Sequence, residues 1–259
     1  KLRVWKESIL TKLGAGVAQL AKMRNVQVIQ GKAYFEGSQT LRVENEHGQQ
    51  FVNFETAIVA VGSLPALPKT FDLGNPRIMT STEALEIEDI PENLLVVGGG
   101  YIGMEMGTIY AALGSKITVV EALENILAGA DPDLARPVVA AARKAFKEIR
   151  LKARVNKMST VGKQIKVEME FDGKQVEELY DRVLVSVGRA ANSADLGLEN
   201  TKVVLDEKGF IKVNTKQQTD DPHIYAIGDI AGGILLAHKA HKEGRIAVEV
   251  INGEDSINE

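Results

Sequence analysis

The sequence predicts an α/β protein built on parallel β-sheet, and three observations carry this prediction. Leu94–Val97 is a run of branched apolar residues that enters a glycine cluster, and apolar residues at helical spacing leave it. A second apolar strand, 116–120, follows after Gly114, which is typical of a helix C′ residue. Two further apolar strands, 57–63 and 183–189, both run into glycine, and buried parallel strands have this composition.

The glycine cluster after Val97 matches the dinucleotide-binding pattern G-x-G-x-x-G through Gly98, Gly100 and Gly103. Gly98 allows the turn, Gly100 lets the backbone approach a pyrophosphate, and Gly103 lets the following helix pack closely on the strand. The helix N-terminus then faces the phosphates with free N–H groups. The second strand ends in Glu121, an acid that suits the ribose hydroxyls of NAD and repels the 2′-phosphate of NADP. The alternative is a glycine turn in an α/β unit that binds no ligand.

The N-terminal part combines a helix with short strands. Apolar residues at helical spacing predict a helix over 7–23, and short strands are expected at 26–30, 32–35, 41–44 and 51–53, which form a small antiparallel insertion. The apolar strand 56–63 follows. Pro65 and Pro68 then mark a linker, and the domain boundary is expected near Thr70.

The nucleotide unit is expected to occupy 72–190. Asp131 as N-cap and Pro132 at the first helical position predict a helix that runs to about Lys147. A third parallel strand is expected at 151–155, followed by a hairpin of 164–171 and 175–178. The likeness between strands 57–63 and 183–189 indicates equivalent strands in two similar domains, and the alternative is coincidence between two buried strands.

From Leu198 the chain is expected to return to the first domain. The strand 223–229 ends in Gly228-Asp229, and residues 235–251 form a helix with Ala237, Ala240, Ile246, Ala247 and Val250 facing inward. Asp229 lies at the carboxyl end of its strand, where open α/β sheets bind ligands, and a carboxylate there can accept hydrogen bonds from a polyol. The alternative role for Asp229 is a helix cap.

Composition excludes several classes of function. The chain has 259 residues, of which 44% are hydrophobic and 25% charged, so it can form one large or two medium globular domains. Its net charge of −4 implies no basic face for nucleic acid, and no apolar run approaches a membrane span. The absence of cysteine excludes disulfides, thiolate metal sites and cysteine nucleophiles, and no metal site is predicted. A cytoplasmic or mitochondrial-matrix location is expected, and the start at Lys1 suggests a piece of a longer protein.

These motifs together resemble those of the flavoprotein disulfide reductases, most closely the dihydrolipoyl dehydrogenase branch. The most specific is Leu235-Leu236-Ala237-His238-Lys239-Ala240 after Gly228-Asp229, with Glu243-Gly244 following. The other segments that carry the resemblance are 98–107, 119–121, 129–134, 187–189 and 225–229. The resemblance covers nearly all of the chain and implies a central segment of such an enzyme: a three-layer Rossmann-like NAD domain at 72–190, and parts of a similar FAD domain with antiparallel meanders at 1–71 and 191–259.

The resemblance also implies the cofactor-binding residues. The NAD-binding residues would be Gly98, Gly99, Gly100, Tyr101, Ile102, Gly103, Glu105, Glu121, Val155, Ser186, Val187, Gly188 and Arg189. The FAD-binding residues would be Ala33, Gly62, Ser63, Asp229, Ala237 and His238. Core packing is the alternative for Val155, and a solvated surface charge is the alternative for Arg189.

The chain departs from the family pattern in ways that bear on activity. The family's FAD-binding glycine loop, its redox cysteine pair and its His-Glu acid/base pair have no counterpart here, so no catalytic residue is assigned and the chain alone is predicted to be inactive. Arg189-Ala190-Ala191-Asn192 also lacks the proline that the family has before the asparagine.

By resemblance, the parent protein would oxidise dihydrolipoamide on the lipoyl domains of 2-oxo acid dehydrogenase complexes through a redox disulfide and FAD, pass hydride to NAD, and form a homodimer. The alternatives are a stand-alone NAD-binding module, and an NADH oxidase or another reductase of the same fold.

Overall fold

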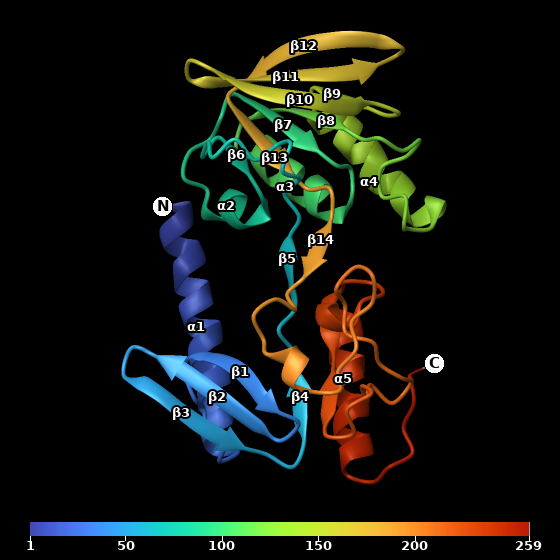
Figure 1. The fold of residues 1–259 in the computed structure, drawn as a ribbon. Coiled ribbons are helices and arrows are strands. Elements are labelled where there is room, and N and C mark those ends of the chain that lie inside the picture. The colour runs from blue at the N-terminus through green and yellow to red at the C-terminus, as the bar shows by residue number, and fades with distance from the viewer. Residues whose placement is uncertain (259) are drawn as a thin grey trace. The chain divides into compact units, whose positions relative to one another are not determined.

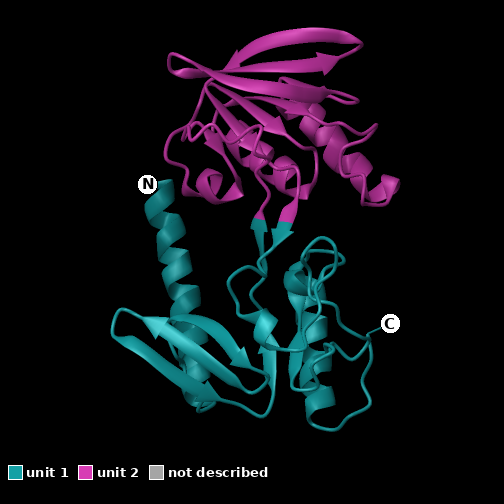
Figure 2. Ribbon diagram, in the orientation of Figure 1, with its two compact units in different colours: residues 1–64, 190–259 teal, residues 65–189 magenta. Residues whose placement is uncertain are grey.

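The computed structural model describes residues 1–258 and divides the chain into two compact units (Figures 1 and 2). Unit 1 comprises residues 1–64 and 190–259, and unit 2 comprises residues 65–189. The chain passes between them twice, in strands β5 (Ser63–Pro65) and β14 (Arg189–Ala191), which pair with each other. None of the helices in the described part of the chain is long and apolar enough to cross a membrane.

Unit 2 is built on a parallel sheet of five strands in the order β6-β13-β7-β8-β9. These strands are β6 (Ile78–Met79), β13 (Arg182–Val185), β7 (Asn93–Val97), β8 (Lys116–Val120) and β9 (Glu148–Arg150). In the central strand, Leu95 stands opposite Thr118 of β8 and Val183 of β13. The chain adds β8 and β9 on one side of β7 and later adds β13 on the other.

The two faces of this sheet bury different layers, which makes unit 2 three layers thick (Figure 1). On one face, Leu94 and Val96 join a core with residues of helices α3 (Tyr101–Ala112) and α4 (Pro132–Ala145). The short helix α2 (Ser81–Glu86) packs in the same core through Ala84. On the other face, Leu95 and Val97 meet the antiparallel meander β10 (Arg154–Val161), β11 (Gln164–Phe171) and β12 (Lys174–Tyr180). Because side chains alternate along a strand, one apolar run serves both layers.

The α/β fold class with parallel sheet and antiparallel meanders is confirmed, but the expected third parallel strand in unit 2 is misplaced. The third strand on this side of the sheet is 148–150 rather than 151–155, because Lys152 takes a left-handed conformation (φ 51°) and turns the chain out of the sheet. The expected hairpin of 164–171 and 175–178 is confirmed as β11 and β12, and residues from Arg154 onward form β10, which adds a third strand to it. Ala153 and Val155 are buried in the core between the sheet and this meander, whereas Leu151 is half-buried beside the core on the helix side.

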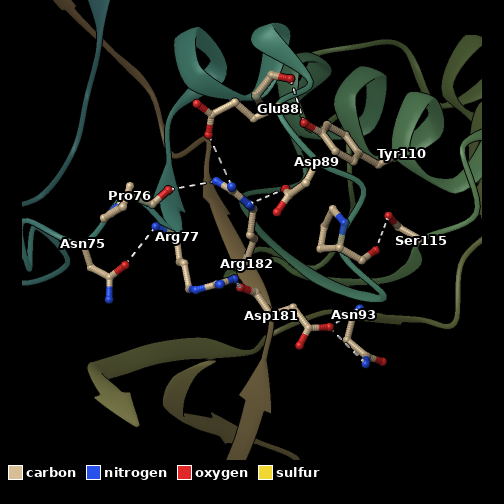
Figure 3. A network of polar contacts seen from close by, with 12 residues as sticks. Asn75, Pro76, Arg77, Glu88, Asp89, Asn93, Tyr110, Ser115, Asp181 and Arg182 are labelled. Atoms are coloured by element: carbon tan, nitrogen blue, oxygen red, sulfur yellow. Dashed lines mark hydrogen bonds and ion pairs between the residues drawn. The ribbon is translucent and has the colours of Figure 1, made fainter. Parts of the chain in front are cut away.

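The amino ends of the parallel strands are tied together by polar side chains (Figure 3). The Asp181 carboxylate accepts hydrogen bonds from the Asn93 backbone N–H (2.8 Å) and the Gln164 side chain (2.9 Å). Arg182 donates to the Pro76 carbonyl (3.0 Å) and forms an ion pair with Asp89 (2.6 Å). These contacts join β7, β11 and β13 and the loops before β6 and β7 at the amino ends of the parallel strands.

Unit 1 holds the remaining elements. The meander β1 (Lys32–Gly37), β2 (Thr40–Asn45) and β3 (Gly48–Asn53) confirms the expected antiparallel insertion, whereas residues 26–30 form no strand. Strands β4 (Ala57–Val59) and β15 (Ile224–Ala226) form a parallel pair, and 3₁₀ turns lie at Leu198–Asn200 and Gly228–Ala231. Helix α1 (Leu2–Met23) starts before the expected residue 7 and buries no side chain, and α5 (Ala237–Ile251) starts two residues later than expected.

The two apolar strands expected at 57–63 and 183–189 are each interrupted. Gly62 (φ 71°) separates β4 from β5, and Gly188 (φ 149°) separates β13 from β14, since these backbone conformations end a regular strand. Along α5, Ile246 and Ala247 are buried as expected, but Ala237 is exposed.

Candidate functional site

The carboxyl edge of the unit 2 sheet brings together three predicted site residues from three strands. Gly98 follows β7, Glu121 follows β8 and Ser186 follows β13. The Ser186 hydroxyl lies 3.0 Å from the Val97 carbonyl oxygen and 3.1 Å from that of Gly98, so it donates into the glycine turn. The chain adds β8 and β9 on one side of β7 and β13 on the other, so the carboxyl end of β7 is a topological switch point of the sheet. Open α/β sheets bind ligands at such a point.

Two of the three motif glycines are required by packing within the chain. A Cβ on Gly103 would lie 2.1 Å from the Gly98 carbonyl oxygen and 2.7 Å from the Ser186 hydroxyl. A Cβ on Gly98 would lie 2.4 Å from the Ser186 carbonyl oxygen, and Gly98 has a φ of 103°. These glycines therefore let α3 start directly against the ends of β7 and β13.

Gly100 differs from the other two motif glycines. It is the N-cap of α3, its φ of −73° and ψ of −179° suit any residue, and a Cβ there would meet no atom within 4 Å. The cap has no side-chain hydrogen bond. A helix N-terminus of this kind presents backbone N–H groups and a partial positive charge. The space above Gly100 is therefore an open cradle suited to an anion.

The Glu121 carboxylate lies beside this turn. One oxygen accepts the Gly99 backbone N–H (2.6 Å) and the other accepts the Leu123 backbone N–H (2.8 Å). A carboxylate oxygen can accept two hydrogen bonds, so Glu121 retains acceptor capacity for hydroxyl donors of a ligand. The acid is thus fixed at the turn by the backbone.

The other predicted NAD-binding residues lie at different distances from this turn along the chain. Tyr101 and Ile102 open α3, and Glu105 is exposed one turn further on. Val187 is exposed, and Gly188 and Arg189 lead into β14. A Cβ on Gly99 would lie 2.6 Å from the Ile126 side chain. Val155 is buried in the core between sheet and meander, which is the packing role considered for it from the sequence.

A second candidate site lies in unit 1 at the carboxyl ends of β4 and β15. Gly62 and Ser63 come after β4, Asp229 comes after β15, and the Ser63 hydroxyl donates to the Asp229 carboxylate. The backbone of Ile227 donates to the Val59 carbonyl (3.0 Å), which holds the two strand ends together. Three of the predicted FAD-binding residues thus share one edge.

The remaining predicted FAD-binding residues belong to other elements of unit 1. Ala33 pairs with Val43 in the meander, and Ala237 and His238 are the exposed first residues of α5.

The sequence reasoning missed a buried ion pair that supports Asp229. The Glu243 side chain on α5 is 4% exposed and pairs with Lys239 at 2.8 Å. Glu243 also accepts the Gly228 N–H (2.8 Å), and Lys239 donates to the Gly228 carbonyl (3.1 Å). The ion pair therefore holds both backbone polar groups of Gly228, the residue before Asp229. The signal was present in the sequence, since an acid four residues from a lysine on the apolar face of a helix requires a partner.

No group of three or more His, Asp or Glu side chains within residues 1–258 is arranged to hold a metal ion.

Known proteins are similar to nearly the whole of this chain. A profile described as "Pyridine nucleotide-disulphide oxidoreductase" matches residues 3–244. Dihydrolipoyl dehydrogenases of Vibrio parahaemolyticus and Staphylococcus aureus are 42% and 39% identical to the chain, over 98% of its length and 54% of theirs. The chain thus spans about half the length of the curated relatives it matches.

Solved structures are similar as well. The chain resembles a Cu(II) complex of a mutant of the HOCl-induced flavoprotein disulfide reductase RclA from Escherichia coli, with a TM-score of 0.88 and 28% identity over 98% of this chain and 57% of that one. It also resembles LpdA from Mycobacterium tuberculosis, with a TM-score of 0.87 and 26% identity over 99% of this chain and 57% of that one.

Proposed function

Because the chain belongs to the pyridine nucleotide-disulphide oxidoreductase family, whose enzymes use FAD and a pyridine nucleotide, we propose that it is a segment of a dihydrolipoyl dehydrogenase. In this proposal unit 2 binds NAD, and unit 1 binds part of FAD. When bound, these cofactors carry the electrons between the dithiol substrate and the nicotinamide. The residues of this chain bind and orient them.

The open cradle at Gly100 is the observation that carries this proposal. Gly98 and Gly103 have contacts within the chain that exclude a side chain, but Gly100 has none. A pyrophosphate at the N-terminus of α3 supplies the missing reason, since a methyl group at Gly100 would occupy its place. Tyr101, Ile102 and Gly103 then present the first-turn N–H groups of the helix to that anion.

Glu121 selects NAD over NADP in this proposal. Its carboxylate is fixed by the Gly99 and Leu123 N–H groups, so it cannot move away from a 2′-phosphate without breaking both bonds. A like-charge contact of this kind costs several kcal/mol, whereas the ribose hydroxyls of NAD can donate to the same oxygens. Ala122, Leu123 and Glu124 offer no cation that would reverse the preference.

In unit 1, we assign Asp229 to the polyol or phosphate region of FAD. Ser63 donates to the same carboxylate, and the Lys239–Glu243 pair fixes the preceding residue, so Asp229 is held by its neighbours on both sides. The Ala237 N–H, at the N-terminus of α5, would serve the flavin ring, and Ala33 would offer backbone to the cofactor.

The parent protein would convert dihydrolipoamide and NAD⁺ to lipoamide, NADH and a proton. That reaction requires a sulfur nucleophile and a base, and this chain contains no cysteine, so the proposal assigns its catalytic residues to the part of the parent beyond this chain. The partners would be lipoyl domains, and the parent would be a homodimer. The similarity to RclA favours another flavoprotein disulfide reductase as the second candidate.

Fluorescence titration of the chain with NADH and NADPH tests the cofactor assignment. NADH should bind at least about tenfold more tightly than NADPH. Glu121→Gln should reduce this difference in affinity between NADH and NADPH, because it removes the negative charge beside the 2′-phosphate. Glu124→Gln is the matched control, since Glu124 is exposed and pairs with Lys152. NADPH binding as tight as NADH binding would contradict the role of Glu121.

The substrate assignment is tested in a second assay, which measures NADH formation from dihydrolipoamide. The full-length parent loaded with FAD should show activity, and this chain alone should show none. A full-length parent that binds NADH but does not oxidise dihydrolipoamide would favour the second candidate.

A further inference from the structure

A cavity of about 280 Å³ lies in unit 2 between helix α4, strand β9 and the loop that precedes α4. No residue of the glycine turn after β7 or of the segment after β13 lines this cavity. The loop 125–130 forms one wall of the cavity. Leu127 in this loop donates its N–H to the Gly99 carbonyl at 2.8 Å. None of the roles considered so far explains this cavity.

The floor of the cavity is apolar. Leu127, Val139, Ile149 and Leu151 line it, and all four are half-buried side chains at the rim of the core cluster beneath α4. Strand β9 is the edge of the sheet and pairs only with β8, so no further strand covers this rim. The floor is therefore a hydrophobic surface that a small apolar group can bury.

Two arginines stand over this floor. Pro132, Arg136, Val139 and Arg143 follow the spacing i, i+4, i+7, i+11 and so form one stripe along α4 that lines the cavity. Within residues 1–258, neither the Arg136 nor the Arg143 guanidinium group forms a hydrogen bond or an ion pair. Such guanidinium groups are suited to a planar carboxylate, which they bind through paired N–H donors.

No acid competes for these two arginines within the cavity. Its lining contains no Asp or Glu. Asp131 and Asp133 flank Pro132 in sequence, but neither lines the cavity or forms an ion pair with Arg136 or Arg143 within residues 1–258. Glu124 pairs with Lys152 at 2.6 Å and Glu148 with Arg150 at 2.6 Å. The lining of the cavity therefore combines two guanidinium groups with an apolar floor.

We propose that this cavity binds a small organic anion, namely a carboxylate with a short apolar chain. The carboxylate would lie between Arg136 and Arg143, and the chain would lie on Val139, Ile149 and Leu151. A cavity of 150 Å³ holds benzene, so by proportion about 280 Å³ has room for roughly ten non-hydrogen atoms. An acid of about six carbons fits this volume.

Calorimetric titration of the chain with hexanoate tests the site. Hexanoate should bind saturably, and Arg136→Gln and Arg143→Gln should each weaken its binding about tenfold. Lys144→Gln is the matched control, because Lys144 is exposed on the same helix and does not line the cavity. Both arginines are exposed, so circular dichroism should show that all three variants remain folded.

Probes that lack one half of the ligand test the chemistry. Hexan-1-ol has no charge and inorganic phosphate has no apolar chain, so each should bind at least about tenfold more weakly than hexanoate. Equal affinity for hexanol would overturn the role of the arginines, and equal affinity for phosphate would overturn the role of the floor.

Two results would reject the site altogether. They are the lack of saturable hexanoate binding, and competitive displacement of hexanoate by NADH, which would assign the cavity to the dinucleotide site.

Discussion

Replacing Gly100 and Gly103 separately by alanine should separate binding from stability. In Gly103→Ala the new Cβ would lie 2.1 Å from the Gly98 carbonyl oxygen, whereas ordinary carbon–oxygen contacts need about 3.3 Å. Helix α3 must therefore move by about 1 Å against a close-packed strand. Overpacking of this kind costs about 1–3 kcal/mol, only part of which the better helix propensity of alanine offsets.

In Gly100→Ala the expected outcome is the reverse. The backbone conformation suits alanine and no atom lies within 4 Å, so the free energy of unfolding should change by less than about 0.5 kcal/mol. The methyl group would occupy the space assigned to the pyrophosphate, so NADH should bind at least about tenfold more weakly.

Urea unfolding followed by circular dichroism, together with NADH fluorescence titration, measures both quantities. A loss of about 2 kcal/mol in Gly103→Ala shifts the unfolding midpoint by on the order of 1 M. Gly37→Ala is the control, since Gly37 lies in unit 1 and a Cβ there also meets no atom within 4 Å. Unchanged NADH affinity in Gly100→Ala would refute the cradle, and unchanged stability in Gly103→Ala would refute the packing argument.

Two further substitutions test the polar contacts of each unit. Burial raises the pKa of Asp181, but hydrogen bonds from the Asn93 N–H and Gln164 outweigh it and lower the pKa overall. The carboxylate thus stabilises the fold above the unfolded pKa of about 3.9. Asp181→Asn should cost about 1 kcal/mol in free energy of unfolding at pH 7, and this difference should shrink as the pH falls through the folded pKa of Asp181. A difference that does not change as the pH is lowered from neutral into the acid range would contradict this. Lys239→Met leaves the buried Glu243 carboxylate without its cation, so thermal unfolding should show a loss of about 3 kcal/mol in stability. The Lys239→Met/Glu243→Gln double variant should recover part of this loss, and a double variant as unstable as Lys239→Met would contradict the role of the ion pair.

The sequence by itself determined the local chemistry of the dinucleotide turn. This turn consists of a strand, a glycine cluster, a helix, a second strand and an acid, in that order. The pattern can be recognised without any distant residue, because each of its parts depends on neighbours in the chain. Gly114 as the C′ residue of α3 and Asp131-Pro132 at the start of α4 are local signals of the same kind, and both are found in the structure. Even α2, which was not expected, has a capping box of Thr80 and Glu83 in the sequence.

The tertiary structure alone decided features that depend on residues far apart in the chain. Apolar residues from 151 to 155 read equally well as sheet or as core, and only the left-handed turn at Lys152 and the meander above the sheet settle which. The bond between Ser63 and Asp229 joins residues 166 apart in sequence. The cavity beside α4 also depends on β9 and the 125–130 loop meeting one helix stripe. Local sequence determines which conformation a segment prefers. Which residues pack against each face of that segment depends on the tertiary fold, because the packing contacts involve residues that are distant in the chain.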